Sequence, residues 1–250
     1  MPTRAFPSAT GASGVQPSRS RAARPEDLQH IPWLVGLDAE ERQRVLDDLR
    51  VVQVDPGELV CRVGRPVTYW FGLIDGLLKM SNDSVSSDGR SMPMTFTGLS
   101  PGGWFGEGTV MKNEAYRYNI QALRKSVVAG IPATTFHWLL GRSIGFNRFV
   151  MNQLNERLGQ FIAAREIDRL THPDERVARS LAALFHPVLY PGVGEVLRIT
   201  QQELGYLVGL SRQRVNEALA ALQGAAVIRI EYGGVRVLDL ESLRAYRSGG

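Results

Sequence analysis

The last fifty residues carry the pattern that most constrains this chain: two helix-start signals and a hairpin signal in a fixed order. Thr200 followed by Glu203 forms a capping box, and Gly209 predicts where that short helix ends. Ser211 then predicts the N-cap of a second helix, whose apolar side chains Val215, Ala218, Leu219 and Leu222 share one face.

A hairpin signal follows the second helix. The segment VIRIEYGGVRVLDL alternates polar and apolar residues around Gly233–Gly234, which is typical of a two-residue β-hairpin. A helix, a turn, a second helix and a hairpin in this order predict a winged helix-turn-helix. A solvated helix in an unrelated bundle would explain the polar face of the second helix but not this order.

The second helix exposes groups that read DNA. At 100° per residue, its polar side chains lie opposite the apolar face, where they suit base edges and phosphates. The candidate DNA-binding residues are Thr200, Gln201, Ser211, Arg212, Gln213, Arg214, Asn216 and Glu217.

From Arg50 to about Ile131 the chain consists of short β-branched and aromatic runs separated by Gly, Pro and Asp turns. This pattern predicts an all-β sandwich or barrel, in which Pro93 is tolerated only at an edge or a bulge. With the helical C-terminal region, the fold class is α+β.

A long helix is predicted between these parts, and it carries a two-turn heptad seam. Met151, Leu154, Leu158 and Phe161 are spaced 3, 4 and 3 residues apart. Spacing alone leaves two interpretations open: the seam packs on its own β-domain, or it pairs with the same helix of a second chain and forms a homodimer. His172-Pro173 predicts the break after this helix.

These patterns divide the chain into four predicted segments. They are a tail over residues 1–27, an effector-type β-domain over 28–142, a dimerisation helix over 143–171 and a DNA-binding domain over 172–250. The net charge of +4 lies in the tail, because residues 1–24 contain four arginines and no acid, so overall charge argues little for DNA. The tail's Pro, Ser, Ala, Gly and Arg content predicts disorder, with a targeting peptide as the alternative.

Several classes of protein and site are excluded by the composition. The longest apolar run begins at Val127 and is too short for a bilayer, so no membrane span is predicted and a cytoplasmic location fits best. Cys61 is the only cysteine, which rules out an internal disulfide, a CxxC zinc site and an iron–sulfur cluster within one chain. The four histidines lack metal-ligand spacing and no catalytic motif appears, so we expect neither a metal site nor an enzyme.

The segment ITQQELGYLVGLSRQRVNEAL resembles the DNA-binding motif of the CRP/FNR bacterial transcription regulators, and the resemblance extends from about residue 28 to the C-terminus. It implies a cyclic-nucleotide-binding-like jelly roll, a homodimer on an inverted-repeat operator and RNA polymerase as a further partner. It also implies that Arg212, Gln213 and Glu217 face bases. Gln213 stands where the family commonly has Glu, and Glu217 where Arg is frequent, so the resemblance leaves the half-site sequence open.

The segment PGGWFGEGTVMKNEAYRYN resembles the family's phosphate-binding cassette. Gly106 allows a tight turn that presents N–H groups to an anion, Glu107 suits a ribose hydroxyl, and Arg117 suits a phosphate. A plain ion pair between Glu107 and Arg117 is the alternative. The resemblance makes these three residues and Tyr118 the candidate effector site.

Three departures from the family argue against cyclic AMP. Tyr118 replaces a small hydroxyl residue, and Phe161 and Ile162 replace hydroxyl residues that meet adenine. The cysteine cluster of the family's oxygen-sensing branch is also absent. The effector therefore stays unidentified: a cyclic nucleotide, another small molecule, or none if the pocket is vestigial.

We expect a sequence-specific transcription regulator. An architectural protein that binds DNA without sequence preference is the main alternative. An enzyme regulatory subunit is disfavoured, because a DNA-reading helix occupies the place of a catalytic domain.

Overall fold

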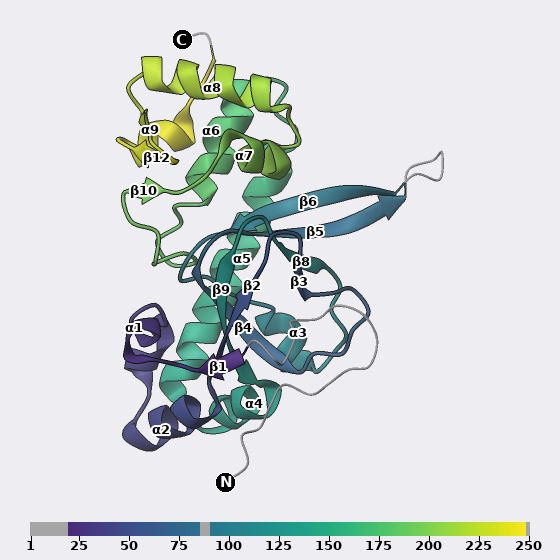
Figure 1. The fold of residues 1–250 in the computed structure, drawn as a ribbon, viewed down its shortest axis with the longest axis vertical. Coiled ribbons are helices and arrows are strands. Elements are labelled where there is room, and N and C mark those ends of the chain that lie inside the picture. Colours follow the sequence, from purple (N-terminus) through teal and green to yellow (C-terminus); the bar gives the residue numbers. More distant parts are fainter. Residues whose placement is uncertain (1–19, 86–90, 249–250) are drawn as a thin grey trace.

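The computed structural model describes residues 20–85 and 91–248. Figure 1 shows a β-domain and a C-terminal helical domain, with helix α5 (Ile144–Ile167) running along the first and leading to the second. The predicted α+β architecture of a jelly roll, a long helix and a helix-turn-helix is confirmed.

The β-domain consists of two antiparallel sheets, as the turn-punctuated runs predict. One sheet has the strand order β1-β2-β9-β4-β7 and the other the order β3-β8-β5-β6. Their bounds are β1 Ser20–Ala22, β2 Arg50–Val54, β3 Leu59–Cys61, β4 Tyr69–Asp75, β5 Leu78–Val85, β6 Ser91–Leu99, β7 Trp104–Phe105, β8 Asn119–Ala122 and β9 Ser126–Pro132. Pro93 pairs with Asp83 on β6, an edge strand, in agreement with its prediction.

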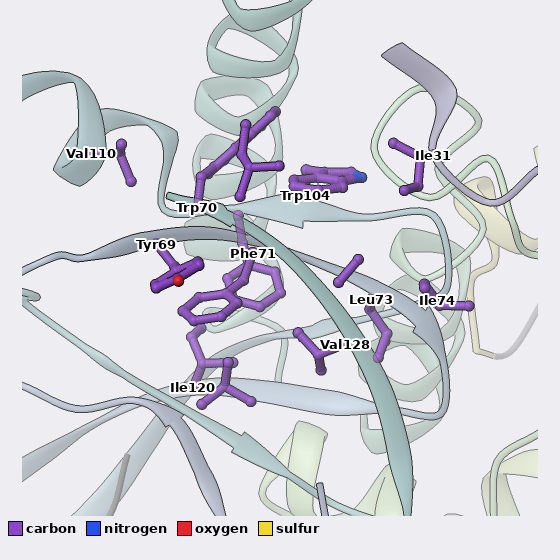
Figure 2. Packing of buried hydrophobic residues seen from close by; sticks show 14 of the residues in the cluster. Ile31, Tyr69, Trp70, Phe71, Leu73, Ile74, Trp104, Val110, Ile120 and Val128 are labelled. Carbon is purple, nitrogen blue, oxygen red and sulfur yellow. The ribbon is translucent and has the colours of Figure 1, made fainter. Parts of the chain in front are cut away.

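Strand β4 supplies side chains to both faces of its sheet. Figure 2 shows Trp70 on one side of β4 near Trp104, and Phe71 on the other side with Ile120 and Val128. Phe71 therefore faces the second sheet, as alternation along a strand requires. The Trp70 and Trp104 ring centroids are 4.4 Å apart, which is within the range of favourable aromatic packing.

Helices close the outer face of the five-stranded sheet over the tryptophans. Their bounds are α1 Pro25–Leu28, the 3₁₀ helix η2 Pro32–Gly36, α2 Ala39–Asp48, α3 Glu107–Lys112 and α4 Ala133–Arg142. Phe146 of α5 lies 5.5 Å from Trp70, centroid to centroid, and Trp33 of η2 lies 5.0 Å from Trp104. Gly72 is required beneath this cluster, because a Cβ there would lie 2.3 Å from the Trp104 ring. This packing fixes α5 against the β-domain.

Regular structure is present within the predicted tail. Strand β1 pairs with β2, and the Arg21 guanidinium donates to both carboxylate oxygens of Asp27 at 2.5 and 2.9 Å. The prediction of disorder through residue 27 is therefore wrong for residues 20–27, because β1 gains hydrogen bonds from β2, a strand distant in sequence. The rest of the predicted tail, residues 1–19, lies outside the described residues.

The C-terminal domain contains the predicted helices and hairpin. Its elements are α6 Pro173–Ala183, β10 Val196–Leu197, α7 Gln201–Val208, α8 Arg212–Gly224, β11 Ile228–Glu231, β12 Gly234–Val237 and α9 Leu240–Ala245. Glu231 pairs with Gly234, so the two turn residues are Tyr232 and Gly233, one position earlier than predicted. Gly233 has a φ of 74°, which glycine adopts readily.

The two domains pack against one another. Leu77 of the β-domain lies in the hydrophobic core cluster of the C-terminal domain, and a Cβ on Gly98 of β6 would lie 2.6 Å from Leu184. Among the described helices, none is long and apolar enough to cross a membrane.

Candidate DNA-binding surface and effector cassette

The helix-turn-helix is built by the caps that the sequence predicts. The Thr200 hydroxyl accepts from the Glu203 amide at 3.2 Å, and the Glu203 carboxylate accepts from the Thr200 amide at 2.7 Å. Gly209 ends α7 with a φ of 67°, and the Ser211 hydroxyl accepts from the Arg214 amide at 3.2 Å to start α8. A Cβ on Gly205 would lie 2.8 Å from the Leu210 carbonyl, so this glycine allows the tight turn.

Helix α8 has the two faces expected of a DNA-reading helix. Its apolar residues Val215, Ala218, Leu219 and Leu222 are all 2% exposed or less. On the other face, Arg212, Gln213, Asn216 and Glu217 are exposed. Polar groups capable of base contacts therefore stand free of the domain core.

The structure brings residues of α7 and α8 together on this surface. The Gln201 amide donates to the Asn216 carbonyl oxygen at 2.7 Å, and Arg212 Nε donates to Gln201 Oε1 at 3.4 Å. Thr200 and Ser211, both exposed, lie at the helix N-termini, where backbone N–H groups favour phosphates. These contacts join the predicted DNA-binding residues of both helices into one polar patch.

Arg214 differs from its neighbours because it is held by two carboxylates. Its guanidinium lies 2.8 Å from Asp174 in the first turn of α6 and 2.8 Å from Glu217. Hydrogen bonds from Arg214 and then Gln213 lower the pKa of Glu217 below its ordinary value. Arg214 thus positions α8 against α6 and keeps Glu217 ionised.

The wing adds candidates that the sequence interpretation missed. Tyr232 is fully exposed at the hairpin tip and Arg229 is exposed on β11, whereas Arg236 pairs with Glu231 at 2.5 Å and with Glu195. The alternation within the hairpin could have indicated Arg229. A cavity of about 390 Å³ separates the wing from α7 and α8.

The effector cassette is present, but two of its charged residues are not brought together. Gly106 has a φ of 83° and caps α3, whose first residue, Glu107, is 3% exposed. Glu107 lies 3.6 Å from Arg157 Nε of α5, while Arg117 is turned outward and pairs with Glu114 at 2.7 Å. The alternative of a Glu107–Arg117 ion pair is therefore wrong.

Arg157 is the buried cation of this region, and the sequence interpretation missed it. Its guanidinium donates to the Trp104 carbonyl at 2.8 Å and to the Tyr190 hydroxyl at 3.2 Å. Glu107 Oε2 is buried without a hydrogen-bond partner among the described residues. One carboxylate oxygen of the cassette can therefore still accept a hydrogen bond.

Tyr118 occupies the space above the glycine of the cassette. Its hydroxyl lies 3.9 Å from the position that a Cβ on Gly106 would take. Burial, together with the negative charge of Glu107, raises the pKa of Tyr118, so its phenol stays neutral. The Tyr118 hydroxyl therefore lies within van der Waals distance of the place where an anion would meet the backbone N–H groups.

Two residues of the α5 seam are exposed, and the other two pack on the β-domain. Met151 and Leu158 are each 61% exposed, whereas Leu154 and Phe161 are half-buried and pack on the β-domain core. Ile162 is also exposed, at 58%. An apolar stripe therefore remains on the outer face of α5 after the helix has packed on its own domain.

In the part of the chain that the structure describes, no group of three or more His, Cys, Asp or Glu side chains is arranged to hold a metal ion. Cys61 is buried, and burial raises its pKa to about 12.

Comparison with known proteins agrees with the two-domain arrangement. Residues 51–143 match the family model of the cyclic nucleotide-binding domain, and residues 175–246 match that of the Crp-like helix-turn-helix domain. These domains in this order define a transcription regulator that joins a cyclic-nucleotide-binding domain to a DNA-binding helix-turn-helix. The chain is therefore a transcription regulator of the CRP/FNR type.

Two curated relatives and one solved structure show the extent of the similarity. The chain is 26% identical over 178 residues to the transcriptional regulator SdrP of Thermus thermophilus, covering 70% of this chain and 81% of that protein. It is 29% identical over 132 residues, 53% of its length, to a cAMP-dependent protein kinase regulatory subunit of Schizosaccharomyces pombe, but spans only 29% of that protein. The structure of FixK2 from Bradyrhizobium japonicum superposes with a TM-score of 0.62 at 16% identity, covering 80% of this chain and 98% of that one, which shows a shared fold.

Proposed function

We propose that the protein is a homodimeric, sequence-specific transcription regulator that binds an inverted-repeat operator through α8. The observation that carries the proposal is the division of α8 into a buried apolar face and an exposed polar face. Arg212 and Asn216 on that exposed face, linked through Gln201, provide donors and acceptors for base edges. Within the part of the chain that the structure describes, the Arg212 guanidinium has no carboxylate partner, which suits a bidentate contact with guanine.

The proposed dimer forms through α5. Met151, Leu158 and Ile162 leave an apolar stripe exposed on a helix that is otherwise fixed to its domain. Pairing this stripe with the same stripe of a second chain buries apolar surface on both chains. It also relates the two helix-turn-helix domains by a two-fold axis. Half-sites in successive major grooves, about 34 Å apart, follow from that symmetry.

In this proposal cyclic AMP is not a tightly bound effector of the regulator. Tyr118 crowds Gly106, and Arg117 points to solvent against Glu114. RNA polymerase as a partner and a cytoplasmic location belong to the same proposal.

The alternative is an architectural protein that binds any duplex. Several groups of the exposed patch also suit phosphates, so geometry alone supports this second function to a lesser degree. The two functions differ in how strongly binding depends on DNA sequence.

Selection from random duplex DNA, followed by titration of the selected site and of a scrambled duplex at one salt concentration, tests the proposal. We expect an inverted repeat preferred by roughly 10³-fold or more over the scrambled duplex. Equal affinity for both duplexes would instead establish the architectural function.

A further inference from the structure

A cavity of about 920 Å³ lies where the two domains and the long helix meet, and the mechanism of DNA reading does not use it. Strand β6, the C-terminal half of α5, helix α6 and the end of α7 line it. None of the lining residues comes from the cassette between Gly106 and Tyr118. The cavity therefore lies outside the phosphate-binding cassette, and it shares only Phe161 with the purine end of the effector site that the resemblance implies.

The walls of this cavity combine apolar surface with cationic side chains. Phe96, Phe161, Leu184 and Leu207 supply aromatic and aliphatic surface from β6, α5, the segment after α6, and α7. Pockets lined mainly by apolar groups with a few charged ones are typical of small-molecule sites. The volume is sufficient for a drug-sized ligand.

Two arginines of α6 give the cavity its specific chemistry. Within the described residues, the guanidinium groups of Arg176 and Arg179 have neither a hydrogen bond nor an ion pair, and Arg179 Nε is buried without a partner. One Nη atom of Arg176 lies 3.7 Å from the position of a Cβ on Gly209, at the turn of the helix-turn-helix. A buried donor left unpaired is costly, so an acceptor at this position would stabilise the folded chain.

The other charged groups that line the cavity are ion-paired or exposed. His186 lies 3.2 Å from Glu156, and Arg244 pairs with Glu241 at 2.7 Å. Arg165, Glu166 and Asp168 are exposed near the end of α5 and carry opposite charges. The unpaired positive charge is therefore concentrated at Arg176 and Arg179.

We propose that this cavity binds an organic anion with an aromatic or aliphatic body. Its carboxylate, sulfonate or phosphate oxygens accept from Arg176 and Arg179, and its body lies against Phe96, Phe161 and Leu207. Because these groups come from both domains, the ligand would bridge the β-domain and the C-terminal domain. The inference deepens the proposed function by giving the regulator an effector site and the chemical class of its effector.

A pair of fluorescent probes separates the anionic contribution from the apolar one. Anilinonaphthalene sulfonate carries a sulfonate on an aromatic body, and phenylnaphthylamine has the same body without the charge. We expect saturable binding of the sulfonate at one site per chain, and a roughly tenfold or greater loss of its affinity in Arg179→Gln, since a charge-assisted hydrogen bond is removed. The affinity for phenylnaphthylamine should stay within about twofold in that variant.

Two further variants keep the test decisive. Arg169→Gln removes an exposed arginine of the same region outside the cavity and should leave both probes unaffected. Ala183→Trp places a large side chain on the cavity wall and should weaken both probes. Circular dichroism and unfolding midpoints that match the unmodified protein show that each variant is folded.

The proposal is overturned if Arg176→Gln and Arg179→Gln bind the sulfonate as the unmodified protein does, or if folded Ala183→Trp still binds both probes. The titrations contain no DNA. A failed operator selection would therefore reject the proposed function while leaving the cavity result intact, and the reverse also holds.

Discussion

Arg212 is the first residue of α8, and its exposed guanidinium donates to the uncharged Gln201 side chain and has no carboxylate partner among the described residues. We predict that Arg212→Ala weakens binding to the selected operator by about 1–3 kcal/mol and relaxes the preference at one base pair, because a bidentate arginine contact carries specificity. Titrations against operators substituted at each position measure both effects.

The wing provides a matched control for Arg212. Arg229 is an exposed arginine of the wing and not of α8, so Arg229→Ala should weaken all duplexes alike and reduce the salt dependence of binding. If Arg212→Ala shows that uniform pattern instead, Arg212 contacts phosphate and not a base.

His186 predicts a pH dependence of stability. Burial lowers the pKa of His186, while Glu156 opposes this shift, and Nδ1 accepts from the amides of Val188 and Leu189 at 3.3 and 3.2 Å. These bonds require a neutral ring. Because the folded-state pKa lies below the ordinary 6.5, the unfolded chain binds the proton more readily. The stability contribution is present above that ordinary value and is lost as pH falls through the folded-state pKa.

Urea unfolding at about pH 7.5 and about pH 5.5 measures this linkage. We expect the free energy of unfolding to fall more over this interval for the unmodified protein than for His186→Gln, whose side chain does not titrate. The same loss in both proteins would assign the dependence to other groups.

Single residues also show where prediction from sequence ended. The spacing of Glu107 and Arg117 invited an ion pair, but the true partner of Glu107 is Arg157, fifty residues along the chain on α5. Only the packing of α5 against the cassette brings them together, and no local pattern encodes that contact. The caps at Thr200 and Ser211 were predictable because each depends on residues within three positions.

Among the elements, those with local signals were predicted best. Helices α7 and α8 and the hairpin follow from caps, glycines and periodicity, and only the hairpin turn was displaced by one residue. Strand β1 was missed, because its order depends on the exposed edge of β2 and on the Arg21–Asp27 pair. Three residues in a polar, arginine-rich segment give no strand pattern of their own.

The outer stripe of α5 yields a prediction about assembly. Leu158→Glu should give a monomer with weak operator binding, because it places a carboxylate in an apolar seam between two copies. Since Leu158 is 61% exposed in the single chain, the fold itself should be little affected. Sedimentation velocity measures the change in mass.

Asn152→Glu is the matched control for the seam. It adds the same charge at an exposed position of α5 beside the seam, and should leave the dimer unchanged. A Leu158→Glu protein that still sediments as a dimer would show that the chains associate elsewhere or that the seam serves only its own domain.

At the scale of the whole molecule, an ion pair joins the β-domain to the C-terminal domain. Arg124, between β8 and β9, donates to both carboxylate oxygens of Glu203 at 2.8 and 2.6 Å. The same carboxylate caps α7, so the domain contact and the helix start share one group. Sequence predicted the cap, but the contact depends on the docking of two domains.

Arg124→Gln should lower the free energy of unfolding of the C-terminal domain. The Glu203 carboxylate, 11% exposed, would lose its cation, but Arg124 is 25% exposed, so we expect a cost of about 1–2 kcal/mol, below that of a fully buried pair. Denaturation followed by circular dichroism measures it, with Arg198→Gln as an exposed control. An unchanged midpoint in Arg124→Gln would show that the domains are held by apolar contacts alone.

The response of the whole protein to cyclic AMP tests how far the cassette has departed from the family. Tyr118 crowds the phosphate end, and Phe161 and Ile162 offer no hydrogen bond to a purine. Each lost partner costs about 1–3 kcal/mol, so two could weaken binding by roughly a hundredfold or more.

Calorimetry should therefore show cyclic AMP binding in the high micromolar range or not at all, with operator affinity unchanged. Tyr118→Ser, which restores a small hydroxyl residue and opens the space above Gly106, should raise the affinity for cyclic AMP, whereas Tyr232→Ser at the exposed wing tip should not. A low-micromolar dissociation constant in the unmodified protein, coupled to tighter operator binding, would mean that Tyr118 moves aside and that the cassette is a working nucleotide site.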